Sequence, residues 1–258
     1  MRIPSLNALS FNNTRQIANK ELKTTTELQN TPQNHATVPL KTWQAYKINF
    51  SGEKKQDDTA PVYLFLGPPL AGKGTTAEML GNMKGIPVIS TGAILREHAA
   101  KGTEIGKIVK DIMKRGDLVP SDIVMSLVKE RISQDDCQNG FIFDGFPRKV
   151  NEAQDFLELI KDREINGKKH PVKVINFVVD KDVLFDRAER RFSEGKREDD
   201  KIDAVKHRIE VYHTESEPVK QFFDDLGYLI NINTESKVGK ETSREEVFKK
   251  VLDSIEEE

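Results

Sequence analysis

The stretch that most constrains the fold is VYLFLGPPLAGKGTT, residues 62–76. Five mostly apolar residues predict a buried strand, and a loop with two glycines then leads into a helical pattern. Such a unit points several backbone N–H groups and the start of a helix at one place, which suits a polyphosphate. Gly67, Gly72 and Lys73 fit the spacing G-x-x-x-x-G-K, in which the lysine supplies charge for the outer phosphates. A chance glycine-rich turn is the alternative.

Apolar runs and amphipathic stretches alternate along the chain from residue 62 onward. The runs predicted as buried strands are residues 62–66, 86–90, 140–144, 172–180 and 227–233. Helical spacing marks the stretches between them, for example residues 120–132 and residues 243–255, where Ser243 and Glu246 form a capping box. Strands that alternate with helices predict an α/β fold of three layers, with a central parallel sheet of about five strands flanked by helices.

The N-terminal segment differs in composition from the rest of the chain. Asn, Gln, Thr and Lys dominate it, and its scattered apolar residues cannot bury enough surface to offset the entropy of ordering. We expect a disordered extension over residues 1–58 and one folded domain over residues 59–258. A cleaved organelle-targeting peptide is the alternative for the extension, because this segment is mildly basic and rich in hydroxyl groups.

Charge and cysteine content narrow the class of protein. Charged residues make up 32% of the chain but nearly cancel, to a formal net charge of −2, which favours neither a nucleic acid nor a membrane as partner. The chain has no apolar run of about eighteen residues and no apolar core of a secretory signal, so we expect a soluble cytoplasmic protein. The single cysteine, Cys137, excludes an internal disulfide and a multi-thiolate zinc site. We therefore expect an inert thiol and no structural zinc.

Three further motifs follow the glycine-rich loop, which is spelled G-x-P-x-A-G-K-G-T. They are STGAILR at residues 90–96, GDLVP at residues 116–120 and FDGFPR at residues 143–148. In this order and at these spacings, the four motifs closely resemble those of the nucleoside monophosphate kinases, and most of all the adenylate kinase family. The resemblance covers residues 62–258. It implies a P-loop fold with two small segments, an NMP-binding segment at about 90–119 and a short lid at about 191–199.

The resemblance implies a donor site and an acceptor site. Its ATP-binding residues are Gly67, Ala71, Gly72, Lys73, Gly74, Thr75, Arg187 and Arg190. Its AMP-binding residues are Thr91, Arg96, Leu118, Val119, Gly145, Arg148, Glu152, Arg197 and Arg208. The residues it assigns to catalysis are Lys73, Arg148, Arg190, Arg197 and Arg208. Among them, Lys73 follows the transferring group, while Arg148 holds the acceptor phosphate together with Arg96.

Five arginines lie close together between residues 187 and 208. They are Arg187, Arg190, Arg191, Arg197 and Arg208. The first three lie at i, i+3 and i+4, where like charges repel one another unless an anion is present. A solvated helix face with internal ion pairs is the alternative. The resemblance implies that Arg187 stacks on the donor adenine, and that the acidic pair Asp199 and Asp200 orients a short lid without cysteines for zinc.

The chain departs from the family pattern in the loop and beside the metal position. Leu70 stands where glycine is usual, and we expect its side chain to bend outward. Ala93 stands where the family has an aspartate that, with the aspartate of FDGFPR, orders water around magnesium. Asp144 is therefore expected to act on Mg²⁺ alone and through water, with no direct protein ligand. We expect weaker magnesium dependence or lower turnover as the result.

The position that reads the acceptor base is also altered. The residue four places after the FPR arginine is normally glutamine in the family, but here it is Glu152, whose carboxylate only accepts hydrogen bonds. AMP remains the expected acceptor, because adenylate-type members of the family have the sequence STG at residues 90–92. The change to Glu152 should relax the selectivity for the base. Guanine, which offers two donors on that edge, is one alternative. A one-residue shift that uses Gln154 is the other.

The resemblance implies a monomeric phosphotransferase that moves the terminal phosphoryl group of MgATP to AMP and, in reverse, uses two ADP. Phosphoryl transfer relies on positioning and charge neutralisation, so the lack of an obvious catalytic base is no objection. A UMP/CMP or GMP kinase of the same fold and a catalytically weak nucleotide sensor are the alternatives. A P-loop hydrolase is disfavoured because no residue has a dedicated water-positioning role.

Overall fold

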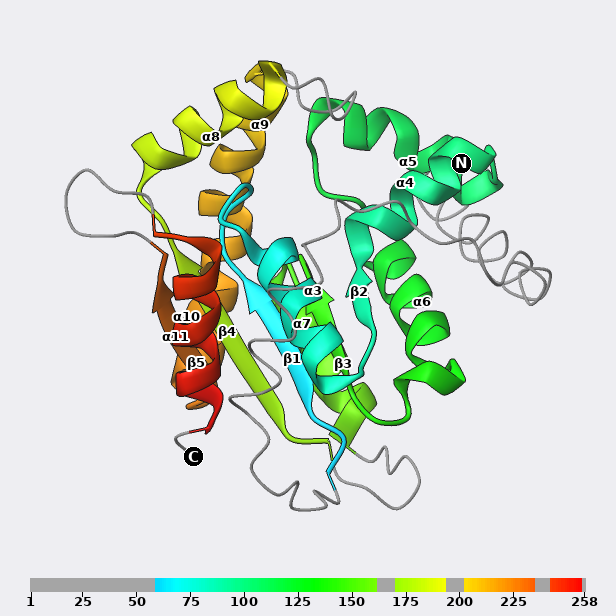
Figure 1. Ribbon diagram of the computed structural model, residues 1–258. Coiled ribbons are helices and arrows are strands. Elements are labelled where there is room, and N and C mark those ends of the chain that lie inside the picture. Colours follow the sequence, from blue (N-terminus) through cyan, green and yellow to red (C-terminus); the bar gives the residue numbers. More distant parts are fainter. Residues whose placement is uncertain (1–58, 162–169, 194–201, 235–241, 257–258) are drawn as a thin grey trace.

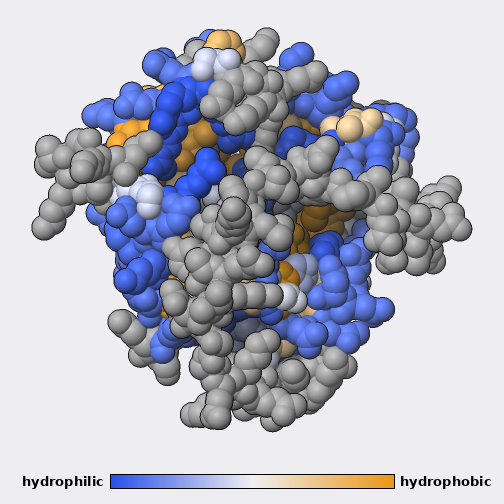
Figure 2. All heavy atoms as spheres, viewed as in Figure 1, coloured by the Kyte–Doolittle hydropathy of each residue, from blue (hydrophilic) through white to orange (hydrophobic). Residues whose placement is uncertain are grey.

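The computed structural model describes residues 59–161, 170–193, 202–234 and 242–256. The predicted N-terminal extension, Arg197 and the acidic pair Asp199 and Asp200 lie outside these residues. Among the helices described, none is both long and apolar enough to cross a membrane. On the face shown in Figure 2, most of the described surface is hydrophilic, and hydrophobic atoms show mainly in recesses.

A five-stranded parallel sheet forms the centre of the domain (Figure 1). Its strands are β1 (Val62–Leu66), β2 (Val88–Ser90), β3 (Phe141–Asp144), β4 (Val172–Val178) and β5 (Leu229–Asn233). They lie in the order β2-β3-β1-β4-β5, and every adjacent pair is parallel. The predicted α/β sheet and its five strands are confirmed, and each strand apart from β1 is somewhat shorter than its apolar run.

Helices cover both faces of this sheet and also lie above the carboxyl ends of its strands (Figure 1). They are α3 (Lys73–Lys84), α4 (Thr91–Lys101), α5 (Glu104–Arg115), α6 (Ser121–Ile132), α7 (Val150–Lys161), α8 (Lys181–Ser193), α9 (Ile202–Val211), α10 (Glu217–Asp225) and α11 (Arg244–Glu256). Short helices span Asp135–Cys137 and Tyr212–Ser216. The predicted capping box of α11 is confirmed, since the Glu246 N–H donates to Ser243 Oγ at 3.1 Å and the Ser243 N–H donates to Glu246 Oε2 at 2.9 Å.

Side chains of β1 alternate between two cores, as a central strand requires. Val62, Leu64 and Leu66 pack with α6, α7 and α10, together with apolar residues of α4 and α5. Tyr63 and Phe65 pack with α3 and α11 on the other face. A third, smaller cluster joins α8 and α9 above the carboxyl ends of the strands. The two larger cores hold the sheet rigid, so the loops at its carboxyl edge have a fixed base.

Cys137 lies in the core next to α6. Its side chain is fully buried, and burial raises the pKa of its thiol to about 12. A thiol with so high a pKa carries almost no thiolate near neutral pH. The prediction of an inert cysteine therefore agrees with its surroundings.

Candidate active site

The glycine-rich loop joins β1 to α3 at the carboxyl edge of the sheet. Gly67 has φ +135°, and a Cβ there would lie 2.8 Å from the backbone oxygen of Phe177 in β4. Gly72 has φ +94° and forms the N-cap of α3, whose first turn contains Gly74 and Thr75. Only glycine combines these backbone angles with so close an approach. The loop therefore directs the N-terminus of α3 toward the space above the sheet, as a phosphate cradle requires.

Lys73 lies over this loop and is held by it. Its Nζ donates to the carbonyl oxygens of Gly67, at 2.8 Å, and Pro68, at 2.7 Å. Desolvation by burial lowers the pKa of Lys73 from 10.5 to about 8, although the charge of nearby Asp144 acts in the opposite direction. The ammonium group is thus kept in place by neutral oxygens, and an anion in the cradle would be a stronger partner.

Asp144 ends β3 beside the start of α3. A Cβ on Gly74 would lie 3.1 Å from Asp144 Oδ2, so this carboxylate faces the first turn of the helix. Among the described residues, no group of three or more His, Cys, Asp or Glu side chains could hold a metal ion. One carboxylate next to a phosphate cradle does fit Mg²⁺, which keeps most of its waters and binds chiefly through nucleotide phosphates.

Ala93 lies on the next strand–helix turn along the sheet. Ser90, opposite Asp144 in the β2–β3 register, caps α4 by accepting a hydrogen bond from the Ala93 N–H at 3.4 Å. The first turn of α4 contains no acidic residue. The first turn of α4 therefore places no second carboxylate near Asp144.

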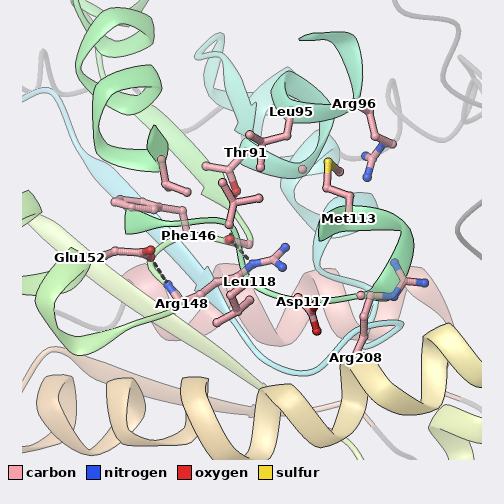
Figure 3. Close-up of a pocket in the computed structure, with 15 residues that line it drawn as sticks. Thr91, Leu95, Arg96, Met113, Asp117, Leu118, Phe146, Arg148, Glu152 and Arg208 are labelled. Atoms are coloured by element: carbon pink, nitrogen blue, oxygen red, sulfur yellow. Dashed lines mark hydrogen bonds between the residues drawn. The ribbon is translucent and has the colours of Figure 1, made fainter. Parts of the chain in front are cut away.

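A pocket opens between α4, the loop after α5, and the turn after β3 (Figure 3). Its cavity volume is about 70 Å³, and it is open to solvent. Of the residues predicted to bind AMP, those that line it are Thr91, Arg96, Leu118, Val119, Gly145, Arg148, Glu152 and Arg208. The remaining one, Arg197, lies outside the described residues. Segments far apart in the sequence thus bring almost the whole predicted acceptor set to one place.

The turn after β3 fixes Arg148 within this pocket. The carbonyl oxygen of Gly145 accepts from Arg148 Nε at 2.8 Å and from Thr91 Oγ1 at 3.1 Å. Phe146 anchors the turn in the core, with its ring centroid 4.9 Å from that of Phe143 and 5.5 Å from that of Phe156. Partial desolvation and the charge of Arg208 lower the pKa of Arg148, whereas Asp144 and Glu152 act to raise it. The guanidinium is therefore positioned before any ligand arrives.

Glu152 lies at one end of the pocket, and Arg208 lies at the other (Figure 3). The Glu152 side chain is 2% exposed. Its Oε2 accepts from the Arg148 N–H at 2.8 Å, and its Oε1 accepts from Ser121 Oγ at 3.1 Å. Sequence reasoning missed Ser121, which the residue pattern marks only as the start of α6. Gln154 is exposed and is not part of the pocket lining, so the structure gives the alternative of a one-residue shift no support.

A second contact that sequence reasoning missed joins the acceptor loop to α9. His207 Nε2 lies 2.9 Å from Asp117 Oδ1, and Arg115 Nε donates to Asp117 Oδ2 at 2.8 Å. At Gly116, a Cβ would lie 3.0 Å from Cγ of Arg208. The segment that follows α5 therefore packs directly against α9, the helix that carries Arg208.

The predicted donor arginines lie on α8, away from the pocket lining. Arg187 is half-buried, and its Nη1 donates to the carbonyl oxygen of Leu70 at 3.0 Å. Arg190 is exposed near the end of the helix. The predicted lid, at about 191–199, begins on α8 and mostly lies outside the described residues. The structure therefore connects Arg187 with the glycine-rich loop and does not bring Arg190 into the pocket.

Comparison with known proteins agrees with this arrangement. The adenylate kinase family model matches residues 65–228. The chain is 39% identical to the adenylate kinase of Caldicellulosiruptor saccharolyticus, over 65% of this chain and 88% of that protein. It is 39% identical to those of Archaeoglobus fulgidus (66% and 89% covered) and Thermosipho africanus (74% and 98% covered). A parallel sheet with a glycine-rich loop, an adjoining arginine-lined pocket and these matches lead to one conclusion: the chain belongs to the adenylate kinase family.

Proposed function

We propose that this phosphotransferase moves the terminal phosphoryl group of MgATP to AMP, giving two ADP, and that it also runs in reverse. The observation that carries the proposal is the shared pocket, where side chains from α4, the β3–α7 turn and α9 meet. Arg96, Arg148 and Arg208 supply three cations to it. A nucleoside monophosphate carries a dianionic phosphate that this set suits.

The pocket has a direction that supports one orientation of AMP. Arg96 and Arg208 lie on the side away from Glu152, and the guanidinium of Arg148 lies between (Figure 3). The phosphate belongs at the arginine end and the base at the Glu152 end. Arg148 is then placed to hold the acceptor phosphate toward the loop that carries Lys73. Close approach and fixed direction supply much of the acceleration of a phosphoryl transfer.

Lys73 exchanges partners when ATP binds. Its ammonium leaves the carbonyl oxygens of Gly67 and Pro68 for phosphate oxygens, which hold a cation more strongly. Mg²⁺ bound with ATP neutralises charge on the phosphates. Asp144 contributes by accepting hydrogen bonds from water at the start of α3. The arginines of α8 and of the lid segment complete the cation set around the transferring group.

Glu152 determines how strictly the base is read. Its two oxygens each accept one hydrogen bond from the protein, and an ionised carboxylate has further lone pairs available. It can accept from the amino group of adenine but offers no proton to the neighbouring ring nitrogen. AMP is the main acceptor, with relaxed selectivity. GMP is the second candidate because guanine presents two donors to a carboxylate.

A coupled assay with purified protein tests the proposal. Turnover should need ATP, Mg²⁺ and a monophosphate together, and AMP should give the highest kcat/KM among AMP, GMP, CMP and UMP. Consumption of ATP alone would indicate a hydrolase, and binding without turnover would indicate a nucleotide sensor. A tenfold advantage for another monophosphate would keep the kinase class but reject the AMP assignment.

The proposal includes a cytoplasmic location and a monomeric state. Neither a nucleic acid nor a membrane is included as a partner, in keeping with the nearly balanced charge of the chain. Cell fractionation and light scattering of the full chain check the location and the oligomeric state.

A further inference from the structure

Leu70, at the tip of the glycine-rich loop, has an unusual backbone conformation. Its φ is +67°, and it is the only non-glycine residue with positive φ in the described parts of the chain. The left-handed region is unfavourable for a residue with a Cβ, and it is strained for a branched side chain. A leucine that persists there must be held by contacts elsewhere.

Two contacts tie Leu70 to the helix pair α8–α9. Its side chain packs against a buried cluster formed by Leu184 and Ala188 of α8 with Val205 and Ile209 of α9. Its carbonyl oxygen accepts the hydrogen bond from Arg187 Nη1 at 3.0 Å. One residue thus connects the loop, by its side chain and its backbone, to both helices that flank the lid segment. In Figure 1, the loop after β1 rises toward α9, in agreement with these contacts.

We propose that Leu70 is a positioning residue that couples the phosphate-binding loop to α8 and α9. Its packing holds the loop in the shape that accepts the donor phosphates. Its carbonyl oxygen holds the guanidinium of Arg187 on the donor side. The coupling is reciprocal, so a donor nucleotide that orders the loop also orders the helix pair.

The location of these contacts predicts a larger effect on the donor than on the acceptor. Leu70, α8 and the apolar cluster are not part of the acceptor pocket lining, which Thr91, Arg148 and Glu152 form with other residues. Of the coupled helices, α9 contributes Arg208 to that lining. A loss of the coupling should therefore weaken the binding of ATP much more than the binding of AMP. This inference rests on the proposed function only in taking ATP as the donor.

Three substitutions separate packing from backbone strain. Leu70→Ala removes the packing and keeps the strained backbone, Leu70→Gly removes both, and Leu70→Met keeps most of the buried volume. We expect Leu70→Ala and Leu70→Gly to raise both the KM and the Kd for ATP by at least about fivefold, with the KM for AMP changed less than about twofold. Leu70→Met should keep the KM and the Kd for ATP near their wild-type values. Val251→Ala, in the core between α3 and α11, is the control for a general loss of packing.

Two further measurements distinguish coupling from a local packing defect. ATP should protect the amides of α8 and α9 from hydrogen exchange in the wild type and protect them less in Leu70→Ala. The effects of Leu70→Ala and Val205→Ala on ATP affinity should be non-additive, because the two side chains share one cluster. Val251→Ala should lower the Tm without changing the ratio of the two KM values.

The proposal is overturned if Leu70→Ala lowers the Tm while the Kd for ATP stays at the wild-type value. Equal rises in the KM values for ATP and AMP would also overturn it. The Kd for ATP is measured by calorimetry without AMP, so it does not depend on turnover. A wild-type chain that binds ATP but does not phosphorylate AMP would reject the proposed function and leave this test intact.

Discussion

The acceptor pocket and the donor loop are organised in opposite ways. In the pocket, protein groups already hold the ligand-facing side chains, as the Gly145 carbonyl does for Thr91 and Arg148. In the loop, the ammonium of Lys73 is held by two carbonyl oxygens that it must leave before it can serve a phosphate. The acceptor side is thus organised before the ligand binds. On the donor side, Lys73 must exchange its carbonyl partners for the phosphates of ATP.

This difference predicts distinct effects of substitutions on the two sides. A change in the pocket should disturb geometry that exists before binding, so the loss should appear in the use of AMP. A change at Lys73 should disturb an exchange of partners, so its effect should depend on pH as well. The following predictions test that contrast, beginning with the largest effect.

Arg148→Ala should lower kcat/KM for AMP by on the order of 10³-fold, by analogy with other arginines that hold transferring phosphates. Arg148→Lys should recover only part of this, because an ammonium lacks the planar fork that donates to Gly145 and to phosphate together. Arg244→Ala, on the exposed start of α11, is the control. Steady-state kinetics that show Arg148→Ala with more than a tenth of wild-type activity would reject the preformed acceptor site.

Lys73→Met should lower kcat by about 10²- to 10³-fold, since it removes a charge placed where negative charge develops. Methionine is also unbranched and is only one atom shorter than lysine, so circular dichroism should show an intact fold. Retention of half the wild-type kcat would reject the role of Lys73 in transfer.

The pKa of Lys73 gives the donor loop a pH-dependent stability. Because its pKa falls from 10.5 in an unfolded chain to about 8 in the fold, the folded state binds this proton less tightly. The ammonium therefore lowers the free energy of unfolding below pH 8, by at most roughly 3 kcal/mol, and this cost fades as the pH rises from 8 to 10.5.

Urea unfolding of the wild type and Lys73→Met at several pH values measures this cost. The stability of the wild type relative to Lys73→Met should rise between pH 8 and pH 10.5. A constant difference across that range would contradict the buried charge. The apparent affinity for ATP should fall over the same range in the wild type alone, because the phosphates need the proton that Lys73 is losing.

The sequence allowed much of the acceptor side to be predicted, because its residues fall in short motifs at the ends of strands. Thr91, Arg148 and Glu152 follow β2 and β3 closely, so a correct strand prediction places them at one edge of the sheet. Ser121 and His207 were missed because their partners, Glu152 and Asp117, are distant in sequence. Such pairs depend on how α6 and α9 pack, which no local pattern encodes.

The donor side could be predicted less well for a physical reason. Glycine spacing identified the loop, because positive φ and close approach at Gly67 require that residue. The contacts of Leu70 with α8 and α9 depend on tertiary packing that holds a strained backbone. The sequence indicated that leucine was out of place and predicted that its side chain bends outward, but it did not indicate the α8–α9 cluster against which Leu70 packs.

Glu152→Gln should sharpen the preference for AMP over GMP by about tenfold, since one correctly placed hydrogen bond corresponds to roughly 1 to 1.5 kcal/mol. The amide keeps an acceptor for the Arg148 N–H, and the Ser121 hydroxyl can rotate to accept from the new NH₂ group. Glu152→Ala is the comparison that removes both contacts. If Glu152→Gln leaves the ratio of kcat/KM values for AMP and GMP unchanged, Glu152 holds Arg148 without reading the base.

The smallest expected effect concerns magnesium and Ala93. Ala93→Asp places a carboxylate in the first turn of α4, the helix that Ser90 caps. Ser90 lies opposite Asp144 in the sheet register. An acidic residue at the N-terminus of a helix stabilises that helix by roughly 0.3 to 1 kcal/mol. Near Asp144 the two carboxylates repel each other, so this stabilisation should appear when Mg²⁺ is bound and offsets the repulsion. The Mg²⁺ concentration for half-maximal activity should fall by about twofold to fivefold, while Ala93→Asn, which has no charge, should stay near the wild type. If both substitutions have equal effects, the change results from helix capping. The magnesium response of the wild type would then not depend on the missing carboxylate.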